Sequence, residues 1–206
     1  MKKGFVAVGV AVLCLGLAGV LNAAEWADKT TLENMQIAFN GESNAKAKYE
    51  AFAAKADEEG YKSVAALFRA AAKSEGIHAA KHEAAIKKSG GEAKATIEKV
   101  DVKSTKENIE AALKGEVAEK ESMYPEMIKK AEADKNTAAL YSFKGALAAE
   151  KMHAQYYEQA LKELDAWKEA GKEFIVCEVC GYTTTDQKLL KCPVCAAPRS
   201  KFELVK

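Results

Sequence analysis

The sequence predicts a mainly α protein, in which a four-helix bundle is followed by a small metal-binding β domain. Residues 30–171 hold four long segments with apolar side chains at helical spacing. Two glutamates, Glu42 and Glu116, are each followed 33 or 34 residues later by a Glu-x-x-His. Helical character then falls away, and four of the five cysteines lie after residue 176. We therefore place the bundle at residues 25–171 and a metal-binding tail at residues 172–206.

Length and charge limit the classes of function. The chain has 206 residues, enough for one sizeable domain and a small one. Its formal net charge is +1, so it has no concentrated excess of basic side chains. Binding to nucleic acid depends on such a basic surface. We therefore expect no nucleic-acid partner.

The first 24 residues are typical of a secretory signal peptide. Lys2 and Lys3 precede an apolar run from Phe5 to Leu21, and small residues follow at Ala23 and Ala24. We expect cleavage after Ala23 or Ala24, a periplasmic or otherwise exported protein, and no membrane span in the mature form. The alternative is an uncleaved membrane anchor at residues 4–21, which is close to the length that a spanning helix needs.

Four helices are expected within the bundle, at about 30–59, 63–88, 104–133 and 137–170. Thr30-x-x-Glu33 and Ser104-x-x-Glu107 each predict a capping box at a helix start. Pro125 lies inside the third helix, where it should kink the helix or remove one backbone hydrogen bond. The polar stretch 89–104 is a long connection between the second and third helices. Such a crossover favours a ferritin-like bundle over a simple up-and-down one.

The repeated glutamates and histidines predict a two-metal site in the bundle core. A Glu and a His three residues apart lie on one helix face. Two such pairs and two single glutamates are the ligand set of a di-iron or di-manganese carboxylate site. The halves differ at one position, because Glu119 follows Glu116 by three residues whereas Ala45 follows Glu42. Six ligands are thus expected: Glu42, Glu75, His78, Glu116, Glu150 and His153. Glu119 is expected as a seventh.

The tail carries two Cys-x-x-Cys pairs, Cys177/Cys180 and Cys192/Cys195, separated by eleven residues. Four thiolates at this spacing can close a tetrahedral site around iron or zinc. The Gly after Cys180 and the Pro after Cys192 resemble rubredoxin, which holds one iron with four cysteines. That resemblance favours iron. A zinc ribbon is one alternative, and disulfide pairing in an exported protein is another.

Together these features resemble the rubrerythrin family. The segments AFNGESNAKAKY, SEGIHAAKH, GEVAEKESMYPEM and AAEKMHAQYY are similar to the bundle helices of that family, and the tail is similar to its rubredoxin-like domain. The resemblance covers about residues 30–206.

The resemblance implies roles for individual residues. Glu75 and Glu150 would bridge two irons, and Glu116 and His153 would serve one of them. Glu42 would serve the other iron, together with His78 or Glu119 according to oxidation state. Tyr49 and Tyr124 would orient carboxylates or supply a proton. The same pattern does not require His82, which we expect to be a surface residue or to support a ligand from behind.

The function that the resemblance implies is reduction of hydrogen peroxide to water, in protection against oxidative stress. Electrons would come through the tail iron from a rubredoxin-, cytochrome- or flavoprotein-like donor. A tail at the far end of the bundle would imply a head-to-tail homodimer, in which one subunit's tail reduces the other's site. The alternatives are a ferroxidase or iron-handling protein that uses oxygen, and a non-enzymatic electron carrier or redox sensor.

Overall fold

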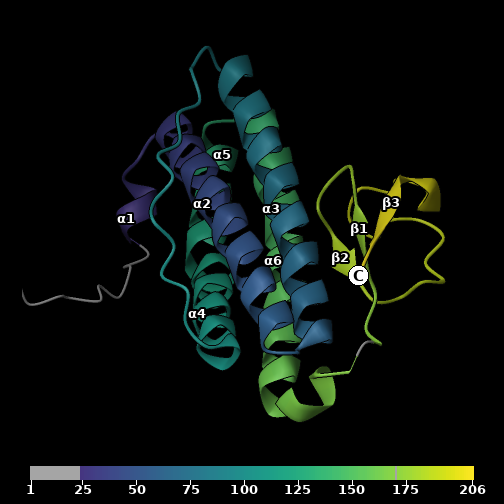
Figure 1. Cartoon of the computed structure of the whole chain (residues 1–206). Helices are drawn as coiled ribbons and strands as arrows, with labels where there is room; N and C mark the ends of the chain where they lie inside the picture. The colour runs from purple at the N-terminus through teal and green to yellow at the C-terminus, as the bar shows by residue number, and fades with distance from the viewer. Residues whose placement is uncertain (1–23, 170) are drawn as a thin grey trace, which may run out of the picture.

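The computed structural model describes residues 24–169 and 171–206. A short helix, α1 (Ala24–Ala27), precedes the bundle. The predicted four helices are present, and the third is divided into three parts (Figure 1). The bundle consists of α2 (Thr31–Glu58), α3 (Lys62–Lys88), α4 (Thr105–Ala118), the π-helical turn η1 (Glu119–Met123), α5 (Tyr124–Ala133) and α6 (Thr137–Lys162).

Both predicted capping boxes are confirmed. The Thr30 side chain accepts a hydrogen bond from the Glu33 amide, and the Glu33 carboxylate accepts one from the Thr30 amide. Ser104 and Glu107 make the same exchange at the start of α4. Each box satisfies amide donors that the first helical turn leaves without partners. Residues 1–23 of the predicted signal peptide lie outside the described residues, and so does the alternative anchor at 4–21.

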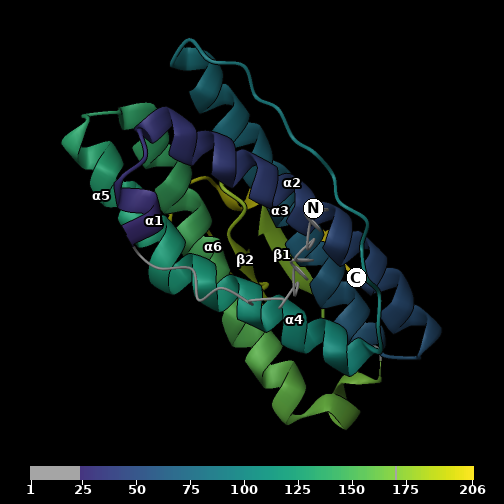
Figure 2. The same cartoon turned by 90° about the vertical axis from the view of Figure 1, so that its left-hand side faces the viewer.

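The crossover between α3 and α4 runs along α2 without regular structure of its own (Figure 2). Two asparagines of α2 hold it there. Asn40 accepts a hydrogen bond from the Thr96 amide at 2.8 Å, and Asn44 accepts one from the Glu98 amide at 2.8 Å. The crossover returns the chain along the bundle, as the ferritin-like arrangement predicts.

The third helix changes its winding immediately before Pro125. Proline has no amide proton and clashes with the carbonyl four residues earlier. Here the Tyr124 amide donates to the Glu119 carbonyl five residues back, and the widened turn spans Glu119–Met123. One extra residue is thereby inserted into the helix. The expected disturbance at Pro125 therefore takes the form of a π turn that begins at Glu119.

The fourth helix ends earlier than expected. It stops at Lys162 instead of near residue 170, and a 3-10 turn, η2 (Leu164–Trp167), follows. The Trp167 side chain is buried in the core, and the Lys168 carbonyl accepts the Lys62 amide at the start of α3. Burial of Trp167 thus bends the chain back toward α3 and directs the tail along the bundle.

Among the described residues there are three hydrophobic clusters; one lies in the tail, and the other two lie on either side of the charged site in the bundle. One bundle cluster includes Tyr49 and Phe68, and the other includes Tyr124 and Phe143. The hydroxyl groups of Tyr49 and Tyr124 reach buried glutamates from the two sides. The aromatic clusters therefore exclude water around the carboxylates and position their hydrogen-bond donors.

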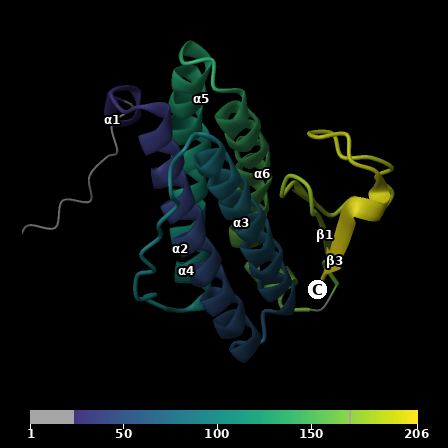
Figure 3. The ribbon, with the colours of Figure 1, turned by 90° about the horizontal axis from the view of Figure 1, so that it is seen from above.

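The tail forms a three-stranded antiparallel sheet in the order β2-β1-β3, with β1 (Phe174–Cys177), β2 (Thr183–Thr184) and β3 (Phe202–Val205). It lies beside α3 and α6, on the side away from α2 and α4 (Figure 3). The Ser74 hydroxyl donates to the Gly181 carbonyl at 2.7 Å, and Lys73 pairs with Glu203 at 2.6 Å. The expectation of a tail at the far end of the bundle is therefore wrong, because these contacts hold it alongside its own helices.

Candidate metal centres

The bundle core brings together six of the predicted ligands in two overlapping groups. One group contains Glu42, Glu75, His78 and Glu150, and the other contains Glu75, Glu116, Glu150 and His153. Within each group the ligand atoms all lie within 4.8 Å of one another. Glu75 and Glu150 belong to both groups, which is the arrangement that two bridging carboxylates require.

The buried side chains fit a pair of bound cations. All six residues have exposed fractions of 1% or less. Six of their atoms are buried without a well-directed hydrogen bond: Glu42 Oε2, both Oε atoms of Glu75, His78 Nδ1, Glu116 Oε2 and Glu150 Oε1. Burying polar and charged atoms without partners is strongly unfavourable unless a cation compensates. Oxygen and imidazole nitrogen are ligands suited to iron. The six unpaired atoms belong to the residues whose ligand atoms cluster in the bundle core.

Both histidines direct Nδ1 toward the carboxylates. His78 Nδ1 lies 2.9 Å from Glu75 Oε2 and 3.1 Å from Glu150 Oε1. His153 Nδ1 lies 2.8 Å from Glu150 Oε2 and 3.3 Å from Glu75 Oε1. The Nε2 atoms point the other way, toward α3 and the tail. Nδ1 is therefore the atom that each imidazole offers to a metal.

Burial and neighbouring charges shift the pKa values of these ligands. Burial, reinforced by the neighbouring charge of Glu150, raises the pKa of Glu116 to about 7. Burial would lower the pKa of His78, but the carboxylates of Glu150, Glu42 and Glu75 raise it well above its ordinary value. Burial likewise opposes protonation of His153, and Glu75 leads the carboxylates that raise its pKa. Metal binding must displace these protons.

Tyr49 and Tyr124 lie where the sequence places them, each bonded to a glutamate. Tyr49 donates from its hydroxyl to Glu116 Oε1 at 2.5 Å, and Tyr124 donates to Glu42 Oε1. Each tyrosine thus fixes one carboxylate oxygen and leaves the other free for a metal.

His82 is fully buried, so the surface alternative is wrong and the supporting role is confirmed. Its Nε2 lies 3.1 Å from the Tyr124 hydroxyl, and its Nδ1 lies 2.7 Å from the Ser142 hydroxyl. A hydrogen-bonded series therefore runs from Ser142 through His82 and Tyr124 to Glu42. Ser142 also lines a surface pocket with Lys81 and Tyr141. The four-residue spacing from His78 was the only signal of this position in the sequence.

Glu119 stands apart from both groups of ligand atoms. It begins the π turn, and the residue as a whole is partly buried. Desolvation and the negative charges of Glu42, Glu116 and Glu150 raise the pKa of its carboxyl well above the ordinary value. Its carboxyl is thus electrostatically coupled to the site without belonging to either group, while His78 belongs to the group that contains Glu42.

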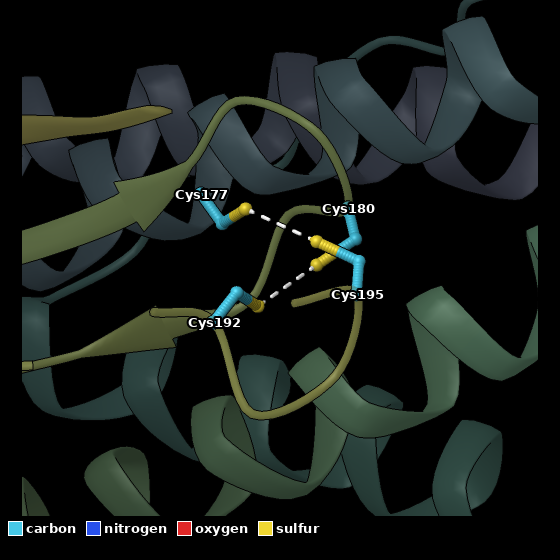
Figure 4. A group of neighbouring side chains, drawn as sticks. All are labelled: Cys177, Cys180, Cys192 and Cys195. Carbon is cyan, nitrogen blue, oxygen red and sulfur yellow. Dashed lines mark hydrogen bonds between the residues drawn. The ribbon is translucent and has the colours of Figure 1, made fainter. Parts of the chain in front are cut away.

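The four tail cysteines converge on one point (Figure 4). Cys177 Sγ lies 3.7 Å from Cys195 Sγ, and Cys180 Sγ lies 3.5 Å from Cys192 Sγ. A tetrahedron with metal–sulfur bonds of about 2.3 Å has sulfur separations of about 3.8 Å. A disulfide bond is about 2.05 Å long, so the disulfide alternative is wrong.

Backbone amides support these sulfurs. A hydrogen bond from the Cys180 side chain, with further ones from the amides of Val179 and Cys180, lowers the pKa of the Cys177 thiol to about 5 although burial opposes this. The neighbouring Cys177 side chain and burial raise the pKa of the Cys180 thiol, and a hydrogen bond from the Tyr182 amide opposes that rise. Gly181 adopts φ +80°, a conformation that favours glycine, directly before the Tyr182 amide that bonds to the Cys180 sulfur. Amide–sulfur bonds of this kind tune the potential of a bound iron.

No helix among residues 24–169 and 171–206 is both long and apolar enough to cross a membrane.

Sequence comparison assigns the two parts of the chain. The family model described as Rubrerythrin matches residues 33–161, and the one described as Rubrerythrin, rubredoxin-like domain matches residues 176–203. Nigerythrin of Nitratidesulfovibrio vulgaris is 37% identical over 174 residues, covering 84% of this chain and 85% of that protein. A rubrerythrin of Porphyromonas gingivalis is 32% identical over 182 residues, covering 85% and 90%.

Solved structures agree with this assignment. A mixed-valence state of nigerythrin superposes with a TM-score of 0.79 at 35% identity, covering 85% of this chain and 86% of that one. A bacterioferritin of Mycobacterium tuberculosis, at 22% identity, superposes with a TM-score of 0.60 over 66% of this chain and 86% of that one, which shows a shared fold. The cofactors that fit the two centres are therefore a carboxylate-bridged di-iron site and a rubredoxin-type iron site with four cysteine ligands, and the chain belongs to the rubrerythrin family.

Proposed function

We propose that the protein is a peroxidase that reduces hydrogen peroxide to water. One peroxide takes up two electrons and two protons and yields two waters. The observation that carries the proposal is Glu119, a carboxyl coupled to the two-metal group but held outside it. A site that only stored metal would not need a seventh carboxyl poised beside a filled ligand set.

The bound irons would supply the two electrons that cleave the oxygen–oxygen bond. Glu75 and Glu150 are shared between the two ligand groups and are proposed as the bridging ligands. Glu116 and His153 would hold one metal ion. Glu42 would hold the other, together with His78 or Glu119. A carboxylate suits the more highly charged ferric ion, and a neutral imidazole suits the ferrous ion.

Proton supply is assigned to the hydrogen-bonded series behind Glu42. Tyr124 holds a proton on its hydroxyl at Glu42, and His82 lies behind it at 3.1 Å. Ser142 links His82 to the pocket at the protein surface. Tyr49 has no histidine partner and is proposed to orient Glu116. A proton that Tyr124 gives up can thus be replaced without opening the core to water.

Electron supply is assigned to the four-cysteine centre of the tail. The Gly181 carbonyl, directly after Cys180, accepts hydrogen bonds from Ser74 and Thr183. These two hydroxyls lie at the Nε2 atoms of His78 and His153. A short hydrogen-bonded route through Gly181 therefore joins the two metal centres within one chain. Because the tail lies beside its own bundle, electron transfer between the subunits of a head-to-tail homodimer is no longer required. A homodimer, an external one-electron donor and export through residues 1–24 remain part of the proposal.

Reoxidation of the reduced, iron-loaded protein tests the proposal. Stopped-flow absorption at the four-cysteine centre should show bleached iron recovering its colour much faster with hydrogen peroxide than with an equal concentration of oxygen. Equal rates would favour the ferroxidase alternative. Recovery with neither oxidant would favour a carrier or sensor.

A further inference from the structure

The two histidines of the di-iron site share one hydrogen-bond acceptor in the tail, the carbonyl oxygen of Gly181. Ser74 donates to this oxygen at 2.7 Å from α3, and Thr183 donates to it at 3.0 Å from β2. A backbone carbonyl has two acceptor positions and no proton to give. Both acceptor positions are thus occupied by hydroxyl protons.

Each of these hydroxyls also contacts the outward nitrogen of a histidine. Ser74 Oγ lies 3.4 Å from His78 Nε2, and Thr183 Oγ1 lies 3.1 Å from His153 Nε2. A hydroxyl has a single proton, and here the carbonyl takes it. Toward the imidazole each hydroxyl can therefore only accept, so the imidazole must carry its proton on Nε2.

This direction of bonding matters for metal binding. A neutral imidazole with its proton on Nε2 has its lone pair on Nδ1, and Nδ1 is the atom that faces the carboxylates. If the hydroxyls were free to donate, Nε2 could accept and the proton would sit on Nδ1, where it would block the metal.

The close approach of the tail depends on Gly181 itself. A β-carbon at this position would lie 2.8 Å from both His78 Cδ2 and Ser74 Oγ, and closer still to His78 Nε2. The residue also adopts φ +80°, a conformation that favours glycine. Gly181 therefore serves the four-cysteine site and the di-iron site at once.

We propose that the rubredoxin-like tail is a structural part of the di-iron site: through the Gly181 carbonyl, with Ser74 and Thr183 as positioning residues, it fixes both histidines in the metal-binding tautomer. The inference concerns metal binding and is independent of the peroxidase proposal. Partners of this kind commonly contribute 10- to 100-fold to metal affinity.

The test uses the full chain loaded with Zn²⁺, which gives sharp nuclear magnetic resonance spectra. The chain has only three histidines, so ¹⁵N–¹H correlation of labelled imidazoles resolves each one. Thr183→Val should weaken Zn²⁺ binding in the bundle by about 10- to 100-fold and remove the protected Nε2 proton of His153. Ser74→Ala should do the same for His78, with a smaller effect because its contact is longer. Thr183→Ser should restore the native affinity and spectrum.

Thr184→Val is the matched control, because Thr184 is a buried threonine of the same strand whose hydroxyl accepts from the Asp186 amide. Native affinity and spectrum in this control, together with four-cysteine metal binding in every variant, would show that the tail is intact. Native affinity and a retained Nε2 proton in Thr183→Val would overturn the proposal. Equal losses in Thr183→Val and Thr184→Val would also overturn it, since they would reflect a loosened tail.

Discussion

The two halves of the bundle supply the same parts to the metal site in the same order. Each half gives a single glutamate, then a tyrosine, then a Glu-x-x-His on the following helix. The tyrosine of each half bonds to the glutamate of the other, Tyr49 to Glu116 and Tyr124 to Glu42. The site is therefore pseudo-symmetric, and each half supplies a hydrogen-bond donor to the other. The features that give the two metal positions different roles must lie where the halves differ.

The first difference is one residue of spacing. Tyr49 follows Glu42 by seven residues, close to two turns of α-helix, whereas Tyr124 follows Glu116 by eight. An eighth residue would rotate the tyrosine by about 100° away from the site. The π turn at Glu119–Met123 absorbs the extra residue, so Tyr124 still reaches Glu42. The insertion thus lies next to Glu119, the carboxyl that the first half lacks.

The second difference lies one turn beyond each histidine ligand. His82 follows His78 by four residues, and Tyr157 follows His153 by four. His82 bonds to Tyr124 and Ser142, whereas the Tyr157 hydroxyl is buried without a partner among the described residues. The side of the metal site at Glu42 therefore has a route for protons, and the side at Glu116 is closed by aromatic packing.

The largest expected effect on stability is a pH dependence in the half that holds Glu116. The pKa of Glu116 is raised from 4.5 to about 7 in the metal-free fold. The folded state therefore binds the proton more tightly than the unfolded state, and this stabilisation is present below pH 4.5 and lost as the pH rises to 7. Relative to wild type, metal-free Glu116→Gln should gain about 3 kcal/mol of unfolding free energy between pH 4.5 and pH 7.

Urea unfolding at the two pH values measures this gain. A constant difference between wild type and Glu116→Gln across the range would show that Glu116 is not held neutral by its surroundings.

The tyrosines give an effect of similar or smaller size and test the asymmetry directly. Tyr124→Phe removes a hydrogen bond to Glu42 and also leaves His82 Nε2 without its hydroxyl partner. Tyr49→Phe removes only the bond to Glu116. We expect Tyr124→Phe to cost about 3 kcal/mol and Tyr49→Phe about 1.5 kcal/mol in the metal-free protein. Equal losses in thermal unfolding would mean that His82 adds nothing to the first half.

The smallest effect comes from the tail, which is also built from two similar parts. Gly181 follows the second cysteine of the first Cys-x-x-Cys pair and has φ +80°. Ala196 follows the second cysteine of the other pair and has φ 60°. A residue with a β-carbon is disfavoured there by about 1 kcal/mol. Ala196→Gly should therefore stabilise the tail by up to that amount, seen as a higher denaturant midpoint for loss of the iron–thiolate absorption. A lower midpoint would show that the Ala196 methyl group makes contacts that outweigh the strain.

The ligand set could be predicted from the sequence because its information is local. Helical periodicity places Glu75 with His78 and Glu150 with His153, and four cysteines at fixed spacing define a tetrahedral site. The π turn had only the indirect signals of Pro125 and the eight-residue spacing. The docking of the tail depends on the contacts of Ser74 with Gly181 and of His153 with Thr183, which join residues far apart in the chain and follow no periodic pattern. The burial of His82 likewise depends on how α3 packs against α5 and α6.

Replacement of Glu119 tests the central claim most directly, because it removes the part that only the second half possesses. Glu121→Ala is the matched control, since Glu121 lies in the same π turn but is exposed. Both variants should bind iron in the bundle and in the four-cysteine site. Glu119→Ala should slow reoxidation of the reduced protein by peroxide by about 10- to 100-fold, while Glu121→Ala reacts at the wild-type rate. Wild-type peroxide turnover in iron-loaded Glu119→Ala would contradict the account.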